Sequence, residues 1–189
     1  MRIAATGYWT DEQQKLYHVR CEPLCDWIIN FFGNEKDKQL YDFGCGNGQY
    51  LQKISSAGFT KLTGFEGKVP LFKDFENIMQ QDLTVPFVLP EKGNCIFLEV
   101  AEHVPAQFED IMLSNVVNAC KGKMVMSWAE LGQPGCGHVN CASNEMAISK
   151  LMAKGMIYMP EETALVRATI PDNDPYIWFK KTTMVFKKD

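Results

Sequence analysis

The stretch YDFGCGNGQY, residues 41–50, decides the fold of this 189-residue chain. It continues an apolar run, QLYDF, and then places glycine at three of five successive positions: Gly44, Gly46 and Gly48. Glycine loses more conformational entropy on folding than any other residue, so three so close together require a physical reason. A turn with generous glycine use is one reason, and a ligand that rests directly on the main chain is another. We favour the ligand, and expect a strand, a binding turn and a helix in that order.

The bulk composition is that of a soluble globular protein. Hydrophobic residues make up 46% of the chain and charged residues 22%, which is enough apolar material for a core. The net charge of −4 gives no general attraction to nucleic acid, so we expect no nucleic-acid partner. The lysines near the end of the chain are expected on a solvated strand face and tail.

Neither a signal peptide nor a membrane-spanning segment is predicted. The N-terminal sequence MRIAATGYWTDE lacks an apolar segment of signal-peptide length, and no run of about 18 apolar residues occurs. We therefore expect a soluble, cytoplasmic protein without a membrane partner. The seven cysteines are odd in number and scattered, so they are expected to be free thiols.

Hydrophobic periodicity predicts alternating strands and helices. The first helix is expected to have Thr10 as its N-cap and a kink or a division at Pro23. One or two helical turns are expected over residues 69–75. The other expected elements are strands over 39–43, 61–66, 77–82, 95–100 and 123–128, and helices over 11–32, 49–57, 107–120 and 144–154.

The last part of the chain is expected to form an antiparallel hairpin. Residues 164–170 and 176–186 have strand character, and the loop between them, PDNDP, is too short for a helical crossover. Strands that alternate with helices predict an α/β sheet that is mostly parallel, and this hairpin would complete it.

The spacing of the glycines distinguishes two kinds of nucleotide-binding turn. The dinucleotide fingerprint G-x-G-x-x-G would place its third glycine at position 49, whereas this chain has Gly48 and the string D-x-G-x-G-x-G from Asp42. That string resembles the first motif of the class I S-adenosylmethionine-dependent methyltransferases. The resemblance implies S-adenosylmethionine as cofactor. Asp42 would suit its cationic amine, and the cofactor would lie against the main chain of Gly44, Cys45, Gly46 and Gly48.

Three further motifs follow in the order of that family. Glu66, with Gly67 after it, ends the second expected strand and is suited to accept both ribose hydroxyls. The resemblance places Asp82 and Leu83 beside the adenine. Glu99 ends the fourth strand within CIFLEVAEHVP, which resembles the fourth motif. Any one match is weak, but four in register are strong, and the resemblance covers about residues 39–128.

The stretches TGYW and SWAELGQPGCGHVN resemble a group of short, poorly characterised class I methyltransferases, to which no substrate can be attached. In this family the segment before the sheet often lies over the cofactor as a lid, which implies cofactor contacts for Tyr8, Trp9 and His18. A histidine on a helix surface is the alternative reading of His18.

Two histidines are candidates for chemistry. His138 follows the glycine-rich loop GQPGCG after the fifth strand, and we expect it to contact substrate or to act as a general base. The alternative is that GHVN only pins the loop by hydrogen bonds. His103, beside Glu102, is the second candidate for the base, unless the two residues merely cap the next helix.

Two other residues are expected near the substrate. Asn140 is suited to orient the substrate or the loop, and Trp128 either forms a wall of the substrate pocket or belongs to the core. Cys136, His138 and Cys141 form the string C-x-H-x-x-C, which matches no usual zinc finger or ribbon and has no evident fourth ligand. No metal site is therefore predicted.

The resemblance implies one Rossmann-like methyltransferase domain over residues 1–189, with a helical lid segment over 1–36 and the core over 37–189. Its sheet would be doubly wound and seven-stranded, mostly parallel with the last strand antiparallel. We expect methyl transfer by in-line displacement to the O, N or S atom of a small molecule or exposed group. The alternative is a catalytically silent S-adenosylmethionine-binding module in a protein complex, and a nicotinamide oxidoreductase is less favoured.

Overall fold

The computed structural model describes residues 3–10 and 19–189, and its strands form one sheet in the order β3-β2-β1-β4-β5-β7-β6. Neighbouring strands are parallel from β3 through β5, and β7 runs antiparallel to both of its neighbours, β5 and β6. The strands are β1 (Leu40–Phe43), β2 (Leu62–Glu66), β3 (Ile78–Gln80), β4 (Gly93–Phe97), β5 (Cys120–Ser127), β6 (Ile157–Tyr158) and β7 (Thr183–Lys188). This confirms the expected mostly parallel, seven-stranded sheet.

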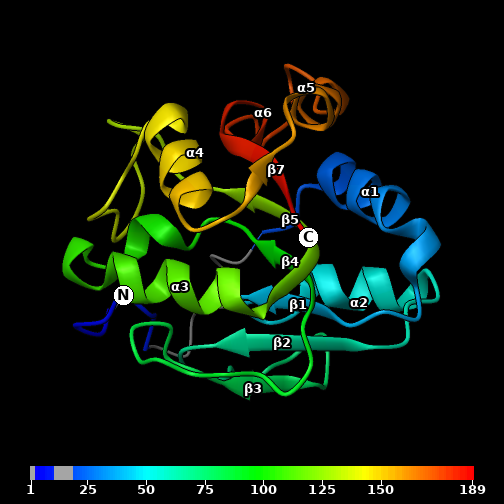
Figure 1. Ribbon diagram of the computed structural model, residues 1–189, viewed down its shortest axis with the longest axis horizontal. Helices are drawn as coiled ribbons and strands as arrows, with labels where there is room; N and C mark the ends of the chain where they lie inside the picture. The colour runs from blue at the N-terminus through cyan, green and yellow to red at the C-terminus, as the bar shows by residue number, and fades with distance from the viewer. Residues whose placement is uncertain (1–2, 11–18) are drawn as a thin grey trace.

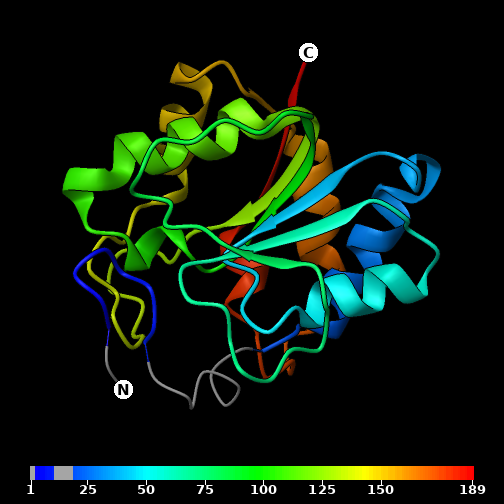
Figure 2. The ribbon, with the colours of Figure 1, turned by 90° about the horizontal axis from the view of Figure 1, so that it is seen from below.

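Helices cover both faces of the sheet (Figures 1 and 2). Helices α3 (Glu109–Ala119) and α4 (Asn144–Ala153) pack on one face, and α1 (Glu22–Phe31), α2 (Gln49–Ser56) and α5 (Pro160–Thr169) pack on the other. The short helix α6 (Phe179–Thr182) leads into β7, and the 3-10 turns are η2 (Gly33–Glu35), η3 (Ala101–His103) and η4 (Ala106–Phe108). Among the described residues, none of the helices has the length and apolar character needed to cross a membrane.

The apolar core lies in two layers, one on each face of the sheet. Side chains alternate along a strand, so β4 sends Cys95 and Phe97 into the layer under α3 and Ile96 into the layer under α1, α2 and α5. All five residues of β4 are buried. Parallel strands covered on both faces require this continuous apolar run, which is why the central strands were recognisable from the sequence.

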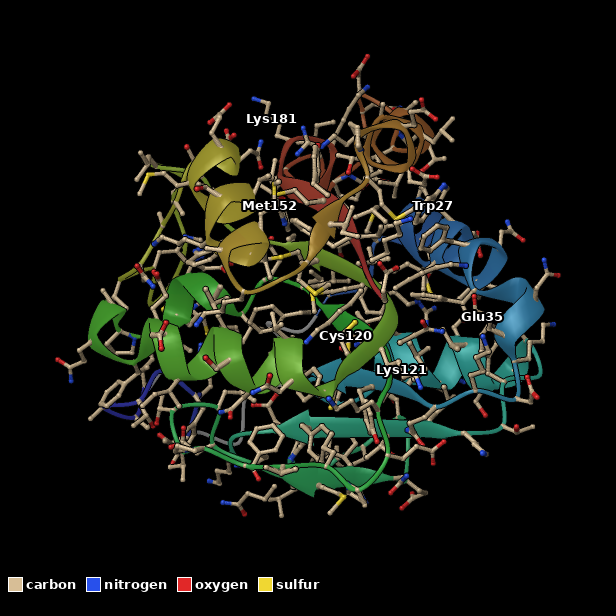
Figure 3. The ribbon with its side chains drawn as sticks, in the orientation of Figure 1. Trp27, Glu35, Cys120, Lys121, Met152 and Lys181 are labelled. Atoms are coloured by element: carbon tan, nitrogen blue, oxygen red, sulfur yellow. The ribbon has the colours of Figure 1, made fainter. Side chains whose placement is uncertain are left out.

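A polar network lies near the amino-terminal ends of β4 and β5, away from the cavity described below. Glu35, labelled beyond the end of α1 in Figure 3, accepts hydrogen bonds from Asn94 Nδ2 at 2.8 Å and pairs with Lys123 Nζ at 2.8 Å. Asn94 Oδ1 in turn accepts the Lys123 backbone N–H at 2.8 Å. Burial alone would raise the pKa of Glu35, but these two partners outweigh it and lower the pKa to about 2. The network ties η2 to the start of β4 and β5.

The first helix differs from its expected extent. It begins at Glu22, and Pro23 occupies its first turn, where the missing backbone N–H costs no helical hydrogen bond. Pro23 therefore starts the helix and does not kink it. The expected helix over residues 11–18, with Thr10 as its cap, lies outside the described residues.

The predicted hairpin near the C-terminus was wrong. Residues 164–169 belong to α5, which begins at Pro160 and has Glu161 and Glu162 in its first turn, a favourable place for acidic residues, and Ile170 is its C-cap. The second expected strand, 176–186, divides into α6 and β7. The strand that pairs with β7 on its outer side is β6, only two residues long, which the sequence did not reveal. The turns expected over 69–75 are bends and not a helix.

An added side chain at Gly48 would destabilise the protein in two ways, through its left-handed backbone conformation and through a clash with Phe75. A comparison with Gly155 separates the two effects. Gly48 and Gly155 have nearly the same φ, +86° and +88°, but a Cβ on Gly48 would lie 2.6 Å from Phe75 Cβ, whereas a Cβ on Gly155 would meet nothing within 4 Å. We expect Gly155→Ala to cost about 1 kcal/mol in unfolding free energy and Gly48→Ala to cost about 1–3 kcal/mol more. Urea denaturation of both variants measures the difference, and equal costs would contradict the packing argument.

Candidate active site

A cavity of about 580 Å³ opens at the carboxyl ends of the strands. The chain passes from β1 to β2 and β3 on one side and then returns to β4 on the other, so the cavity lies where the direction of strand order reverses. Its wall is formed by the N-terminal segment 6–9, the turn after β1, the ends of β2, β3 and β4, the loop 133–138, and the start of α6.

The turn after β1 is left-handed at each of its three glycines. Gly44, Gly46 and Gly48 have φ values of +71°, +56° and +86°. A Cβ on Gly44 would lie 2.3 Å from a methyl carbon of Val100, and a Cβ on Gly48 would overlap Phe75. Two of the glycines are thus required by the backbone conformation and by packing within the protein itself. Gly44, Cys45 and Gly46 still line the cavity, whereas Gly48, which was also expected to contact the cofactor, does not.

Glu66 holds this turn in place from the end of β2. Its carboxylate accepts the Gly46 N–H at 2.9 Å and the Gly67 N–H at 3.0 Å, and the residue is 8% exposed. Burial raises the pKa of the Glu66 carboxyl, and these backbone N–H groups partly offset the rise. Tyr8 packs on Gly67 so closely that a Cβ there would lie 2.3 Å from Tyr8 Cβ.

Asp42, the residue before the last one of β1, lies near Glu66 and is 4% exposed. Burial, followed by the charge of Glu66, raises the pKa of Asp42 to about 8. Among the described residues, none forms an ion pair with Asp42. A cationic ligand in the cavity would supply the missing counter-charge.

Asp82 connects the end of β3 to the N-terminal segment. One carboxylate oxygen accepts the Thr84 N–H at 2.9 Å and the Thr84 hydroxyl at 2.7 Å, and the other accepts the Thr6 hydroxyl at 2.9 Å. Leu83 lines the cavity next to it. The second carboxylate oxygen is therefore directed at the segment that covers the cavity.

The N-terminal segment 3–10 folds back on itself over the cavity (Figure 2). Ile3 and Trp9 form an antiparallel bridge, and the Ala4 N–H donates to the Tyr8 carbonyl at 2.9 Å. Tyr8 and Trp9 both line the cavity. His18, the third residue expected there, lies outside the described residues.

Glu99, two residues after the end of β4, has a φ of +55°, an uncommon conformation for a residue with a side chain. Ser127 at the end of β5 donates its hydroxyl to the Glu99 carboxylate at 2.7 Å and accepts the Glu99 N–H at 2.9 Å. Burial raises the pKa of Glu99 to about 7, although the Ser127 hydrogen bond opposes that rise. The strained turn directs this carboxyl into the cavity.

The structure brings together the three residues considered for chemistry. Glu102 and His103 lie in η3, and His138 ends the loop 133–138, yet one ligand atom from each lies within 4.8 Å of the others. The His103 and His138 rings are 5.1 Å apart and nearly perpendicular, and both line the cavity. Glu102 lies behind them and is fully buried. Burial, together with the charge of Glu99, raises the pKa of Glu102 well above its usual range.

Glycines make this approach of the two imidazoles sterically feasible. A Cβ on Gly135 would lie 2.0 Å from His138 Nε2, and a Cβ on Gly137 would lie 2.5 Å from Ile3 Cδ1 and 3.3 Å from His103 Nδ1. A Cβ on Gly7 would lie 2.3 Å from the His103 carbonyl oxygen. The glycines of TGYW and GQPGCGH therefore pack against the same pair of histidines, His103 and His138. This packing physically connects the two distant motifs.

For Asn140 and Trp128 the structure agrees with the second of the two expected alternatives, a role in the loop for Asn140 and a place in the core for Trp128. Neither belongs to the cavity wall. The Asn140 side chain donates to Glu109 on α3 at 3.0 Å, and its carbonyl accepts the Trp128 indole N–H at 2.6 Å, while Trp128 itself is fully buried. The Val139 and Asn140 N–H groups both donate to the Glu102 carbonyl at 2.9 Å. Asn140 and Trp128 hold the loop that carries His138 and do not face the site of a substrate.

Sequence reasoning missed part of the wall. Trp178 and Phe179 reach the cavity from the start of α6, a segment that was expected to be a strand. Gln133 and Pro134 come from the loop that was noted only for its glycines and histidine. The helix-type spacing of the aromatic residues in YIWFKK was the pattern that could have revealed α6.

No family model and no curated protein matches this sequence. Solved structures do resemble the chain. Magnesium protoporphyrin IX methyltransferase from Synechocystis PCC 6803, with bound S-adenosylhomocysteine, superposes with a TM-score of 0.64 at 14% identity, over 95% of this chain and 94% of that one. The 1,6-didemethyltoxoflavin-N1-methyltransferase from Burkholderia thailandensis superposes with a TM-score of 0.61 at 14% identity, over 96% and 81% of the two chains.

The chain has the class I methyltransferase fold. The [4+2]-cyclase SpnF shares this fold, with a TM-score of 0.59 at 13% identity over 98% of this chain and 87% of that one. The class I methyltransferase fold therefore supports more than one kind of reaction, and the chemistry of this chain has to be argued from its own site.

The raised pKa of Asp42 makes stability depend on pH in a definite direction. Between the ordinary aspartate pKa of about 3.9 and about 8, the folded protein binds more protons than the unfolded chain, so folding stability falls as the pH rises. Asp42→Asn removes this dependence. We expect the melting temperature of the ligand-free variant, relative to wild type, to increase from pH 4 to pH 8.

The matched control is Asp37→Asn, which changes an exposed aspartate. Its melting temperature relative to wild type should stay nearly constant over the same range. A constant difference for Asp42→Asn as well would show that Asp42 is ionised in the folded, ligand-free protein.

Proposed function

We propose that this protein is an S-adenosylmethionine-dependent methyltransferase. The observation that carries the proposal is the meeting, in one cavity of a class I methyltransferase fold, of the glycine turn with carboxyl groups at three adjacent strand ends, Asp42, Glu66 and Asp82. The glycine spacing disfavours a dinucleotide, because the third glycine of the G-x-G-x-x-G fingerprint is absent.

Each part of the cofactor has a suitable partner in the cavity. Asp42 is a buried acid that forms no ion pair with any residue in 3–10 or 19–189, which suits the cationic amine of the amino-acid end. Glu66 is placed to accept ribose hydroxyls once the ligand competes for its carboxylate. Asp82 and Leu83 provide a polar acceptor and an apolar surface for the adenine. The bound S-adenosylhomocysteine named for both methyltransferase neighbours supports this assignment.

The acceptor would bind at the other end of the same cavity, near His103 and His138. In the reaction, the nucleophile forms a bond to the methyl carbon as the carbon–sulfur bond breaks, and the electron pair of that bond stays on sulfur. Alignment of the nucleophilic atom, the methyl carbon and the sulfur contributes most of the lowering of the activation barrier that the protein must supply. We propose a small molecule or an exposed group with a nucleophilic O, N or S atom, in keeping with the small-molecule substrates named for the neighbours.

A silent cofactor-binding module is the alternative. It would bind S-adenosylmethionine and S-adenosylhomocysteine but transfer no methyl group. The cluster of two histidines and a buried glutamate at the far end of the cavity favours the enzyme, since a binding module has no use for it. Incubating the protein and S-adenosylmethionine with metabolite pools, and searching for products heavier by one methyl group, distinguishes the two.

Cofactor binding is tested by calorimetry on wild type and Glu66→Ala. We expect wild type to bind S-adenosylmethionine and S-adenosylhomocysteine but not NAD. Glu66→Ala should weaken binding by about 1.5–3 kcal/mol for each charged hydrogen bond that it removes, partly offset by water. The control, Glu91→Ala, removes an exposed glutamate that pairs with Lys61 at 3.7 Å, and should bind as wild type does. Tight NAD binding without S-adenosylmethionine binding would refute the proposal.

A further inference from the structure

We propose that Glu102, His103 and His138 bind a divalent transition-metal ion at the acceptor end of the cavity. The three residues come from two separate segments, and one potential ligand atom from each lies within 4.8 Å of the others. His138 Nε2 and Glu102 Oε1 are 3.9 Å apart. Ligands about 2.0–2.2 Å from a tetrahedral metal ion lie roughly 3.4 Å from one another, so side-chain movements of about 1 Å would close the site.

The state of Glu102 is the strongest argument for an ion. Its side chain is fully buried, and neither carboxylate oxygen makes a hydrogen bond of ordinary geometry to a described residue. The backbone N–H groups of Glu102 and Ala129 act on the carboxylate but offset only part of the effect of burial. A buried polar group without a partner is costly, and buried carboxylates in proteins are usually paired or coordinate a metal. The side chain that approaches its oxygens most closely among the described contacts is His138, which is itself a potential metal ligand.

The two imidazoles are oriented as metal-ligating histidines usually are. His138 Nδ1 lies 3.1 Å from the Gln133 carbonyl oxygen, and His103 Nδ1 lies 3.2 Å from the Gly137 carbonyl oxygen. A carbonyl oxygen only accepts, so each Nδ1 carries the proton and the lone pair of the neutral ring is on Nε2. Backbone carbonyls that fix the tautomer in this way are a common second shell of metal sites.

The set of donors indicates which ion would bind. Two imidazoles and one carboxylate suit Zn²⁺, Co²⁺, Fe²⁺ and Mn²⁺, whereas Mg²⁺ and Ca²⁺ prefer oxygen ligands alone. Three protein ligands leave at least one coordination position open, as in catalytic zinc sites. Both histidines line the cavity while Glu102 lies behind them, so an open position would face the acceptor.

A role for the ion rests on the proposed methyl transfer. An oxygen of the acceptor that occupies the open position would become more acidic, because a bound cation lowers the pKa of a coordinated hydroxyl. The hydroxyl loses its proton to water, its oxygen forms the bond to the methyl carbon, and the neutral thioether leaves with the electron pair. In that case neither histidine is a general base.

The binding test needs no knowledge of the substrate. The protein, prepared without a histidine tag and freed of metal with a chelator, is titrated with Zn²⁺ alone, Co²⁺ alone and Mg²⁺ alone. We expect one Zn²⁺ or Co²⁺ per chain, visible absorption bands for the Co²⁺ form, a higher melting temperature with either ion, and no competition from Mg²⁺. Absence of stoichiometric Zn²⁺ and Co²⁺ binding, or equal binding of Mg²⁺, would overturn the proposal.

Variants locate the ion. Glu102→Gln keeps the shape of the buried side chain and removes its charge, so it should remain folded and lose at least about 100-fold in affinity, since outer-shell changes alone cost 10–100-fold. His138→Ala, which alters a residue at the cavity wall, should lose binding similarly. Unchanged affinity in both variants would overturn the assignment.

The matched control changes the nearby thiols. Cys141 Sγ lies 3.8 Å from His138 Nδ1, on the nitrogen that donates to Gln133, and Cys136 is exposed in the same loop. The double variant Cys136→Ser, Cys141→Ser should keep the wild-type affinity for Zn²⁺. Loss of binding there would show a thiol site instead of the Glu102, His103 and His138 site.

The two proposals fail in different ways. S-adenosylhomocysteine binding, measured by calorimetry, should be the same in the metal-free protein and in Glu102→Gln, because the cofactor end of the cavity is separate. Cofactor binding without metal binding would refute only the metal site. Metal binding without cofactor binding would refute only the methyltransferase.

Discussion

The close approach of two turns, one after β1 and one after β4, is the constraint on which the rest of the site depends. Gly44 and Val100 meet so tightly that a single added carbon would lie 2.3 Å from the valine methyl. The chain leaves β1 and β4 toward opposite sides of the sheet, so this is the place where a cavity forms in a sheet of this kind. A left-handed turn and a strained Glu99 together keep the cavity open.

Burial of acidic groups gives the cavity its chemical character. Asp42 and Glu66 at one end, and Glu99 and Glu102 at the other, all have a raised pKa because they are removed from water. A site with so many desolvated carboxyl groups is stabilised either by protons or by cationic ligands. The proposed cofactor brings a positive charge to the first end and the proposed metal ion brings one to the second, so the two proposals share a physical basis.

Glycine has two distinct uses in this chain. In the turn after β1 it permits a left-handed backbone packed against Val100 and Phe75. In the N-terminal segment and in the loop before His138 it leaves room for imidazole rings and for the backbone of η3. Without glycine at positions 7, 135 and 137, the two histidines could not lie side by side. The two motifs of unknown purpose, TGYW and GQPGCGHVN, are therefore parts of one structural unit, although they lie far apart in the sequence.

The sequence by itself determined the central parallel strands, the turn that follows β1 and the acidic residues at the strand ends. These features are local: a continuous apolar run, a glycine spacing and a residue directly after a strand are all visible within about ten positions. Tertiary structure alone decided the place of β7 between β5 and β6, because a two-residue strand has no periodicity of its own. It also decided that Trp128 and Asn140 support the loop, and that Glu102, His103 and His138 converge. Those contacts join residues far apart in the chain, and only the folded sheet and its loops set the distances between them.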